Sequence, residues 1–142
     1  SISVRPSRYS HQMIEETGEF VINLTTRELA FATDYCGVKS GKDTDKIKDM
    51  HLNLVPADEV KAPLLKESPV NIECRVKQTL RLGTHDMYLA DVVAVHADEG
   101  YMDEKGRFML EKADLIAYSH GTYYTLGEKL GTFGYSVKKS TT

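Results

Sequence analysis

The sequence predicts a fold that is mostly β-sheet with a few short helices, either an α+β fold or a mostly-β barrel. The first reason is the alternation of apolar and polar residues over 70–77, which is typical of a strand with one buried face. The second is the apolar segment 87–97, which the turn at 82–86 joins to the first strand as an antiparallel hairpin. Strands and helices do not alternate regularly, so a doubly wound parallel sheet is not expected.

Shorter elements are expected on both sides of this hairpin. Met13, Ile14 and Thr17 lie at helical spacing and predict a short helix that Gly18 ends. Short segments rich in β-forming residues predict further strands. These strands are expected at 1–4, 19–24, 51–54, 115–118 and 122–125. The segment 87–97 is apolar on both faces, which favours a place in the middle of the sheet.

Two more helices are expected between residues 26 and 50. Thr26 can cap a helix over 27–35 that ends at Gly37, and this helix has Leu29, Ala30 and Phe31 on its inner side. A loop with two glycines follows at 36–43. Asp43 or Thr44 can then cap a short helix that runs to Met50.

The composition is that of an ordinary globular protein. The 142 residues are 41% hydrophobic and 27% charged, which suits one domain over 1–142. The net charge is -3 without a basic block, which gives no support for a nucleic-acid partner, and no apolar run is long enough for a membrane span. Cys36 and Cys74 are too few for a disulfide framework, so a reducing, cytoplasmic location is expected.

Several common sites are not supported by the spacing of their residues. The segment 37–43 has three residues between its glycines, and Asp43 stands where a phosphate-binding P-loop needs Ser or Thr. The acidic residues of 43–49 miss the calcium-loop pattern, because Ile47 occupies a ligand position. No GxGxxG fingerprint is present. The histidines have no metal-ligand spacing, so no metal site is expected. Their positions are 11, 51, 85, 96 and 120.

Two groups of reactive or aromatic residues have alternative interpretations. Cys74 is expected to be an inert core thiol, because it alternates with polar residues in a strand. Cys36 follows a predicted helix, where the dipole disfavours a thiolate, so we interpret it as structural or ligand-lining rather than nucleophilic. Tyr118, Tyr123 and Tyr124 fit either an aromatic ligand or a core or interface position.

The segment from Arg5 to His11 places two arginines, two serine hydroxyls and a histidine where a strand gives way to a helix. A helix N-terminus has unpaired N–H groups and the positive end of its dipole, so this segment suits a phosphate. The alternative is that Ser7 or Ser10 only caps the helix while the arginines are solvated.

Several segments, in this order, resemble the flavin reductase-like, FMN-binding split-barrel family that includes flavoredoxins. They are 3–10, 19–24, Cys36-Gly37, 40–43 with 45–46, Tyr118 and 123–127. The resemblance implies a homodimer of six-stranded antiparallel Greek-key split barrels, with FMN near the subunit interface. It also implies a further β-segment upstream of residue 1, so we expect a domain that lacks its N-terminal part.

The resemblance also implies which residues contact the cofactor. The segment along the ribityl chain and phosphate matches Arg5, Pro6, Ser7, Arg8, Tyr9 and Ser10. The loop that approaches the isoalloxazine ring and the phosphate side matches Cys36, Gly37, Ser40, Gly41 and Lys42. Lys46 matches the basic residue that closes this loop.

The activity implied is that of an FMN-dependent oxidoreductase that passes electrons from NAD(P)H through the flavin to an acceptor. The flavin carries this chemistry, so no side chain is assigned as catalytic. One alternative is a flavoredoxin-type electron carrier that a partner protein reduces. Another is a non-catalytic split-barrel dimer.

Overall fold

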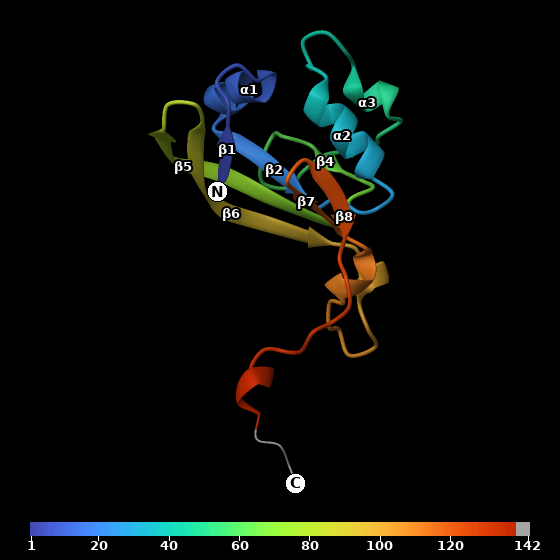
Figure 1. Ribbon diagram of the computed structural model, residues 1–142. Helices are drawn as coiled ribbons and strands as arrows, with labels where there is room; N and C mark the ends of the chain where they lie inside the picture. The colour runs from blue at the N-terminus through green and yellow to red at the C-terminus, as the bar shows by residue number, and fades with distance from the viewer. Residues whose placement is uncertain (139–142) are drawn as a thin grey trace.

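The computed structural model describes residues 1–138, and its centre is a four-stranded antiparallel sheet in the order β1-β6-β5-β2 (Figure 1). These strands are β1 (Ile2–Val4), β2 (Glu19–Asn23), β5 (Val70–Arg81) and β6 (Asp86–Ala97). Two small sheets pair β3 (Leu54–Val55) with β4 (Leu64–Leu65), and β7 (Ile116–Ser119) with β8 (Thr122–Thr125). The mostly-β, antiparallel prediction is therefore confirmed, with four strands in the main sheet rather than six.

The helices are short and lie on the same side of the main sheet (Figure 1). They are α1 (Tyr9–Thr17), α2 (Ala30–Val38) and α3 (Lys46–Asp49), with 3-10 turns η1 (Glu99–Tyr101), η2 (Leu110–Ala113) and η3 (Tyr135–Val137). Gly18 ends α1 in the left-handed region with a φ of 67° and donates its N–H to the Ile14 carbonyl, as the sequence predicted. None of the helices in 1–138 is long and apolar enough to cross a membrane.

The core lies under α1, where the curled sheet brings its two outer strands to one apolar cluster. Ile14 from α1, Phe20 from β2, Cys74 from β5 and Tyr88 from β6 form its buried centre. Cys74 is 3% exposed, and burial raises the pKa of its thiol, which confirms the prediction of an inert core cysteine. The partly buried residues around this centre are Ile2, Val4, Ile22, Ile72, Val76 and Ala90. The sheet is thus a half-barrel closed on its concave side by α1.

The helix α2 differs from its prediction at both ends. It begins at Ala30, because Thr26 is engaged in a β-bridge with Leu115 and does not cap a helix. It continues through Gly37 to Val38, so the prediction of Gly37 as the stop is wrong. Phe31 was placed on the inner side but is 76% exposed. The end of the helix is thus not set by the glycine.

The later elements also shift by a few residues. The helix α3 begins at Lys46, because the carboxylate of Asp45, and not Asp43 or Thr44, accepts the Lys48 N–H at 3.1 Å. It ends before Met50. The strand expected over 51–54 is β3, two residues long and starting at Leu54.

In the two long strands, the burial of some residues differs from the pattern that the sequence predicts. Glu73, on the polar face of β5, is fully buried because the loop at 58–60 covers it. Conversely, Val92 and Val95 of β6 are about 60% exposed. The strand β1 pairs only with the first three residues of β6, from Asp86 to Tyr88, so β6 is mid-sheet over that stretch alone.

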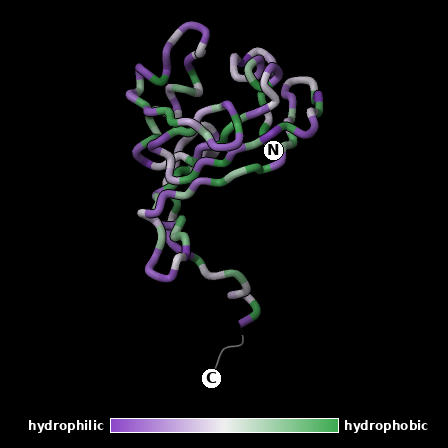
Figure 2. Tube along the Cα trace, turned by 180° about the vertical axis from the view of Figure 1, so that it is seen from behind, coloured by the Kyte–Doolittle hydropathy of each residue, from purple (hydrophilic) through white to green (hydrophobic). Residues whose placement is uncertain are grey.

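Beyond β8, the chain leaves the body as an extended arm over residues 126–138 (Figure 1). Viewed from behind, the arm carries hydrophobic positions along its length (Figure 2). Its large apolar side chains are mostly solvent-exposed. They are Leu126, Leu130, Phe133, Tyr135 and Val137.

Candidate functional site

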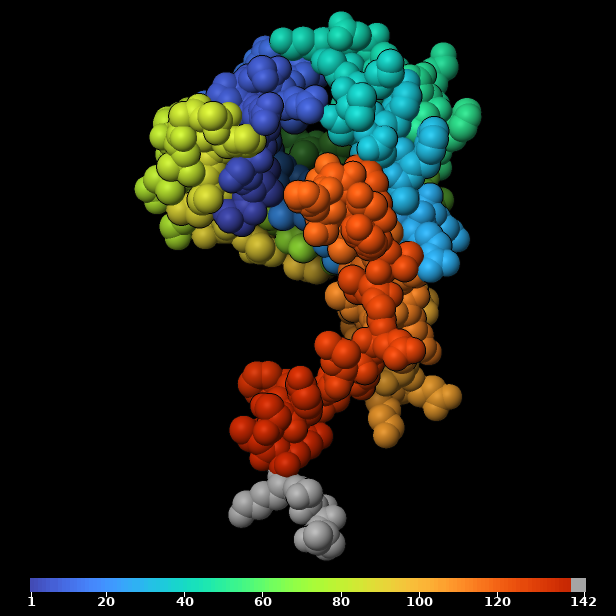
Figure 3. All heavy atoms as spheres, in the orientation of Figure 1, coloured from blue at the N-terminus to red at the C-terminus, as the bar shows by residue number. Residues whose placement is uncertain are grey.

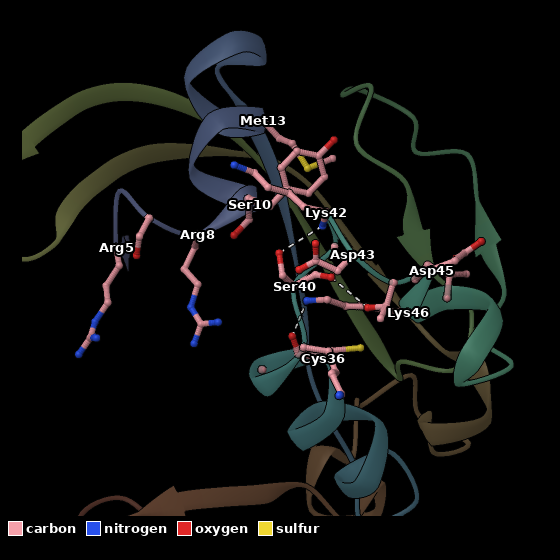
Figure 4. A pocket seen from close by; sticks show the side chains of 17 residues that line it. Arg5, Arg8, Ser10, Met13, Cys36, Ser40, Lys42, Asp43, Asp45 and Lys46 are labelled. Carbon is pink, nitrogen blue, oxygen red and sulfur yellow. Dashed lines mark hydrogen bonds between the residues drawn. The ribbon is translucent and has the colours of Figure 1, made fainter.

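A pocket of about 1180 Å³ opens between the segment that leads into α1 and the segment that joins α2 to α3. Figure 3 shows the molecule hollowed between these segments, and Figure 4 shows the side chains around the hollow. It is lined by Arg5, Ser7, Arg8, Tyr9, Ser10, Met13, Cys36, Gly37, Lys39, Ser40, Gly41, Lys42, Asp43, Thr44, Asp45, Lys46 and Ile47. The structure thus brings together every residue expected at the cofactor site except Pro6.

The turn before α1 forms the first wall. The Arg8 N–H donates to the Arg5 carbonyl at 3.0 Å, and Arg8 is the N-cap residue of α1. No side chain caps this helix, so the interpretation of Ser7 or Ser10 as a cap is wrong. Within residues 1–138, the Arg8 guanidinium has no hydrogen-bond or salt-bridge partner, and the structure leaves it available to a ligand. Arg5 donates a hydrogen bond to His85 at 3.4 Å.

The loop after α2 forms the second wall and is held by its own hydrogen bonds. The Ser40 carbonyl accepts the N–H groups of Asp43 and Thr44, both at 3.2 Å, and the Thr44 hydroxyl at 3.0 Å. Lys46 Nζ donates to the Cys36 carbonyl at 2.6 Å, which ties the start of α3 to the last turn of α2 (Figure 4). These hydrogen bonds lie within the chain, and they hold the two ends of the loop together.

Tyr9 joins the two walls. Lys42 Nζ lies 5.8 Å from the centre of the Tyr9 ring, within cation–π range. A Cβ added at Gly41 would lie 3.0 Å from Tyr9 Cδ1, so a larger residue there would require the Tyr9 ring to move by a few tenths of an ångström. A Cβ at Gly37 would meet nothing within 4 Å. Of the two glycines expected to allow close approach to a ligand, Gly37 alone has that space.

The electrostatics of the lining favour an anion. Basic side chains outnumber acidic ones, and one of the acidic residues, Asp45, is engaged as the α3 cap. The basic residues are Arg5, Arg8, Lys39, Lys42 and Lys46. With free serine hydroxyls at the N-terminus of α1, this end of the pocket suits a phosphate, while the open helix end near Gly37 suits a flat group.

A partly buried polar network lies behind the first wall. His11 Nε2 lies 2.7 Å from Asp86 Oδ2, and Arg81 bonds both Asp86 and Glu15. The Tyr88 hydroxyl donates to Glu15 at 2.7 Å. The hydrogen bond with His11, together with Arg81, lowers the pKa of Asp86, whereas burial and the Glu15 carboxylate raise the pKa of Tyr88 to about 12.

Sequence reasoning missed this network because its members are far apart in the chain. His11 was expected to lie with the arginines of the phosphate segment, but it points to the sheet and does not line the pocket. One local signal was available. His11 and Glu15 are four residues apart and flank Ile14, the buried residue of α1, so both belong to the inner face of the helix.

The tyrosine cluster does not belong to this pocket. The rings of Tyr118 and Tyr123 lie 4.9 Å apart across the β7–β8 hairpin. Burial and the nearby Asp34 raise the pKa of Tyr123. Tyr118 and Tyr124 are more than half exposed, so neither is a core residue.

One group of possible metal ligands, Asp58, Glu73 and His96, lies away from the pocket, with ligand atoms within 4.8 Å of one another. The Glu73 carboxylate already accepts three backbone N–H groups, from residues 58–60, and contacts His96 Nε2 at 2.5 Å. Burial opposes its ionised form, but these hydrogen bonds outweigh burial and lower the pKa of Glu73 to about 2. The Glu73 carboxylate therefore holds the loop at 58–60 against β5.

Comparison with solved structures gives close matches to two flavoredoxins. The flavoredoxin of Desulfovibrio vulgaris (Miyazaki F) matches with a TM-score of 0.86 at 27% identity, over 95% of this chain and 73% of that one. The flavoredoxin of Methanosarcina acetivorans matches with a TM-score of 0.85 at 29% identity, over 96% and 75%.

Sequence relatives and a family model agree with these matches. An uncharacterized protein of Archaeoglobus fulgidus is 34% identical over 73% of this chain, and the match spans only 59% of that relative. An uncharacterized protein of Pyrococcus abyssi is 32% identical over 91% of this chain and 73% of its own length. The model of the flavin reductase like domain matches residues 1–127, and the chain therefore belongs to this family.

Proposed function

We propose that this chain, as one domain, binds FMN in the pocket between the α1 and α2–α3 segments and acts as a flavin-dependent oxidoreductase. The observation that carries the proposal is the convergence of two distant segments, 5–10 and 36–46, on one basic pocket. Their residue types match the two ends of FMN, a phosphate and a planar ring.

The phosphate is placed at the N-terminal end of α1. There Arg8 and the hydroxyls of Ser7 and Ser10 have no partner within the described chain, and the positive end of the helix dipole favours an anion, although the His11 N–H already donates to the Arg8 carbonyl. The ring is placed against the last turn of α2, where Gly37 leaves space for a close approach. FMN, when bound, accepts a hydride and passes on electrons. The residues of the pocket bind it, orient it and stabilise negative charge on its ring.

NAD(P)H is proposed as the electron donor. This is supported by a 42-residue match, at 40% identity, to the FMN reductase (NADH) RutF 2 of Rhizobium rhizogenes. The similarity to two flavoredoxins favours a second function, an electron carrier that a redox partner protein reduces. Stopped-flow mixing with NADH and NADPH separates the two, because the flavin of a carrier would stay oxidised.

A homodimer is also proposed. The arm at 126–138 carries an apolar surface that the other described residues do not cover, with Leu130 89% and Phe133 fully exposed. Val92 and Val95 of β6 are further exposed apolar side chains. A second copy of the chain would bury both.

FMN titration followed by flavin fluorescence tests the binding site. Arg8→Ala removes a proposed phosphate contact and should weaken FMN binding by about 1.5–3 kcal/mol. Arg107→Ala is the control, since Arg107 pairs with Glu111 and does not line the pocket. Equal affinity of the Arg8→Ala variant and the wild type would contradict the placement of the phosphate. Absence of FMN binding by the wild type would overturn the whole proposal.

A further inference from the structure

We infer that Asp86 is a positioning residue that fixes the phosphate-binding turn, residues 5–10, so that FMN affinity depends on Asp86 through the phosphate. The inference rests on the proposed FMN site. It concerns a residue that does not line the pocket.

Both ends of the turn are attached to this one residue. The turn leaves β1 at Val4, which pairs opposite Asp86 in the antiparallel ladder between β1 and β6. It enters α1 at Tyr9, and His11 in the first turn of that helix lies 2.7 Å from Asp86 Oδ2. The turn therefore begins beside the backbone of Asp86 and ends at its side chain.

The contacts inside the turn are few. The N–H of Arg8 bonds the Arg5 carbonyl, and Arg5 itself is held by a long 3.4 Å contact to His85. Without the attachment at Asp86, the position of Arg8 and of the first N–H groups of α1 would be weakly fixed.

The helix α1 also depends on polar contacts for its position, because Ile14 is its one buried residue. The side chain of Asp86 is 7% exposed and that of His11 is 14% exposed, so this pair is shielded from solvent. Arg81 connects Asp86 to Glu15 one turn further along the helix, so Asp86 is the member of the network that holds the N-terminal turn. A shielded, hydrogen-bonded pair fixes geometry more firmly than an exposed one.

The sign of the expected effect separates positioning from simple electrostatics. Removal of the Asp86 carboxylate deletes a negative charge behind an anion site, and Coulomb's law alone predicts tighter FMN binding. Removal of His11 deletes a group that carries positive charge when protonated, and Coulomb's law alone then predicts weaker FMN binding. Positioning predicts that both changes weaken binding.

The test compares the affinities of FMN and riboflavin, which lacks the phosphate, in Asp86→Ala, His11→Ala and the wild type. The expected result is a rise of about tenfold or more in the Kd for FMN, with a clearly smaller rise in the Kd for riboflavin. His11→Gln, which keeps a donor toward Asp86, should restore FMN affinity. Glu16→Ala is the matched control, because this exposed carboxylate on α1 bonds Gln12 instead.

Three results would overturn the inference. They are unchanged or tighter FMN binding by Asp86→Ala, an equal loss for FMN and riboflavin, and no recovery in His11→Gln. If Asp86→Ala does not fold, the comparison of His11→Ala with His11→Gln decides the question in the same way. If the wild type binds FMN but the ratio of the Kd for FMN to the Kd for riboflavin is unchanged in the variants, the inference is rejected and the proposed function stands. Absence of FMN binding by the wild type would reject both.

Discussion

Lys46 Nζ donates a 2.6 Å hydrogen bond to the backbone carbonyl of Cys36. This carbonyl lies in the last turn of α2, where backbone oxygens lack intrahelical partners. The bond connects the two ends of the loop 39–45, which forms one wall of the pocket. Lys46 thus shapes the proposed FMN site through the backbone, although the resemblance assigned it a direct role at the cofactor.

Lys46→Ala should therefore loosen the loop and weaken FMN binding about tenfold, which corresponds to the loss of one charge-assisted hydrogen bond of about 1.5 kcal/mol. Lys46→Arg should retain part of the affinity. FMN titration measures both variants. Lys48→Ala is the control, since Lys48 lies on α3 but does not line the pocket. Unchanged affinity in Lys46→Ala would show that the bond does not shape the site.

Gly37→Ala should separate fold stability from ligand binding. Alanine stabilises a helix interior by about 0.5–1 kcal/mol relative to glycine, and its Cβ would meet no protein atom here. The ligand-free variant should thus unfold at higher urea concentration. FMN should bind less tightly, because the methyl group enters the space proposed for the ring. A variant that gains both stability and FMN affinity would place the ring elsewhere.

Glu73 should contribute a pH-dependent part of the stability. Its pKa is lowered from 4.5 to about 2, so folding favours the ionised form. This stabilisation is fully present above pH 4.5 and is lost as the pH falls toward 2. Urea denaturation at a series of pH values should show that the stability difference between the wild type and Glu73→Gln shrinks over this range. Glu104→Gln, in an exposed turn, should show no such trend, and a pH-independent difference for Glu73→Gln would contradict the assignment.

The arm should control the oligomeric state. Leu130→Ser combined with Phe133→Ser removes the two most exposed apolar side chains of the arm and should convert the proposed dimer to a monomer. Light scattering coupled to size-exclusion chromatography measures the mass. Lys129→Ser is the control from the same segment. A wild-type protein that is already monomeric at micromolar concentration would contradict the proposed dimer.

Local patterns in the sequence predicted the β5–β6 hairpin, the end of α1 at Gly18 and the inward position of Cys74. Alternation and helix-stop signals act over a few residues, so they can be read without tertiary information. The resemblance to a known family, and not these local patterns, grouped Arg5–Ser10 with the loop around Gly41, and the structure brings these segments to one pocket.

The errors arose where distant residues decide the structure. Thr26 was expected to cap a helix, but it is taken by a β-bridge to a residue almost ninety positions away. Glu73 occupies the polar face of an alternating strand, yet the loop at 58–60 buries it. The pairing of His11 with Asp86 across 75 positions has no local signal on the Asp86 side.

A crystal structure of the protein with FMN tests the central claim most directly. We expect the phosphate within hydrogen-bonding distance of the Arg8 side chain and the first turn of α1, and the isoalloxazine ring against Gly37. FMN bound elsewhere on the chain, or this pocket filled by neighbouring side chains in crystals grown with saturating FMN, would contradict it.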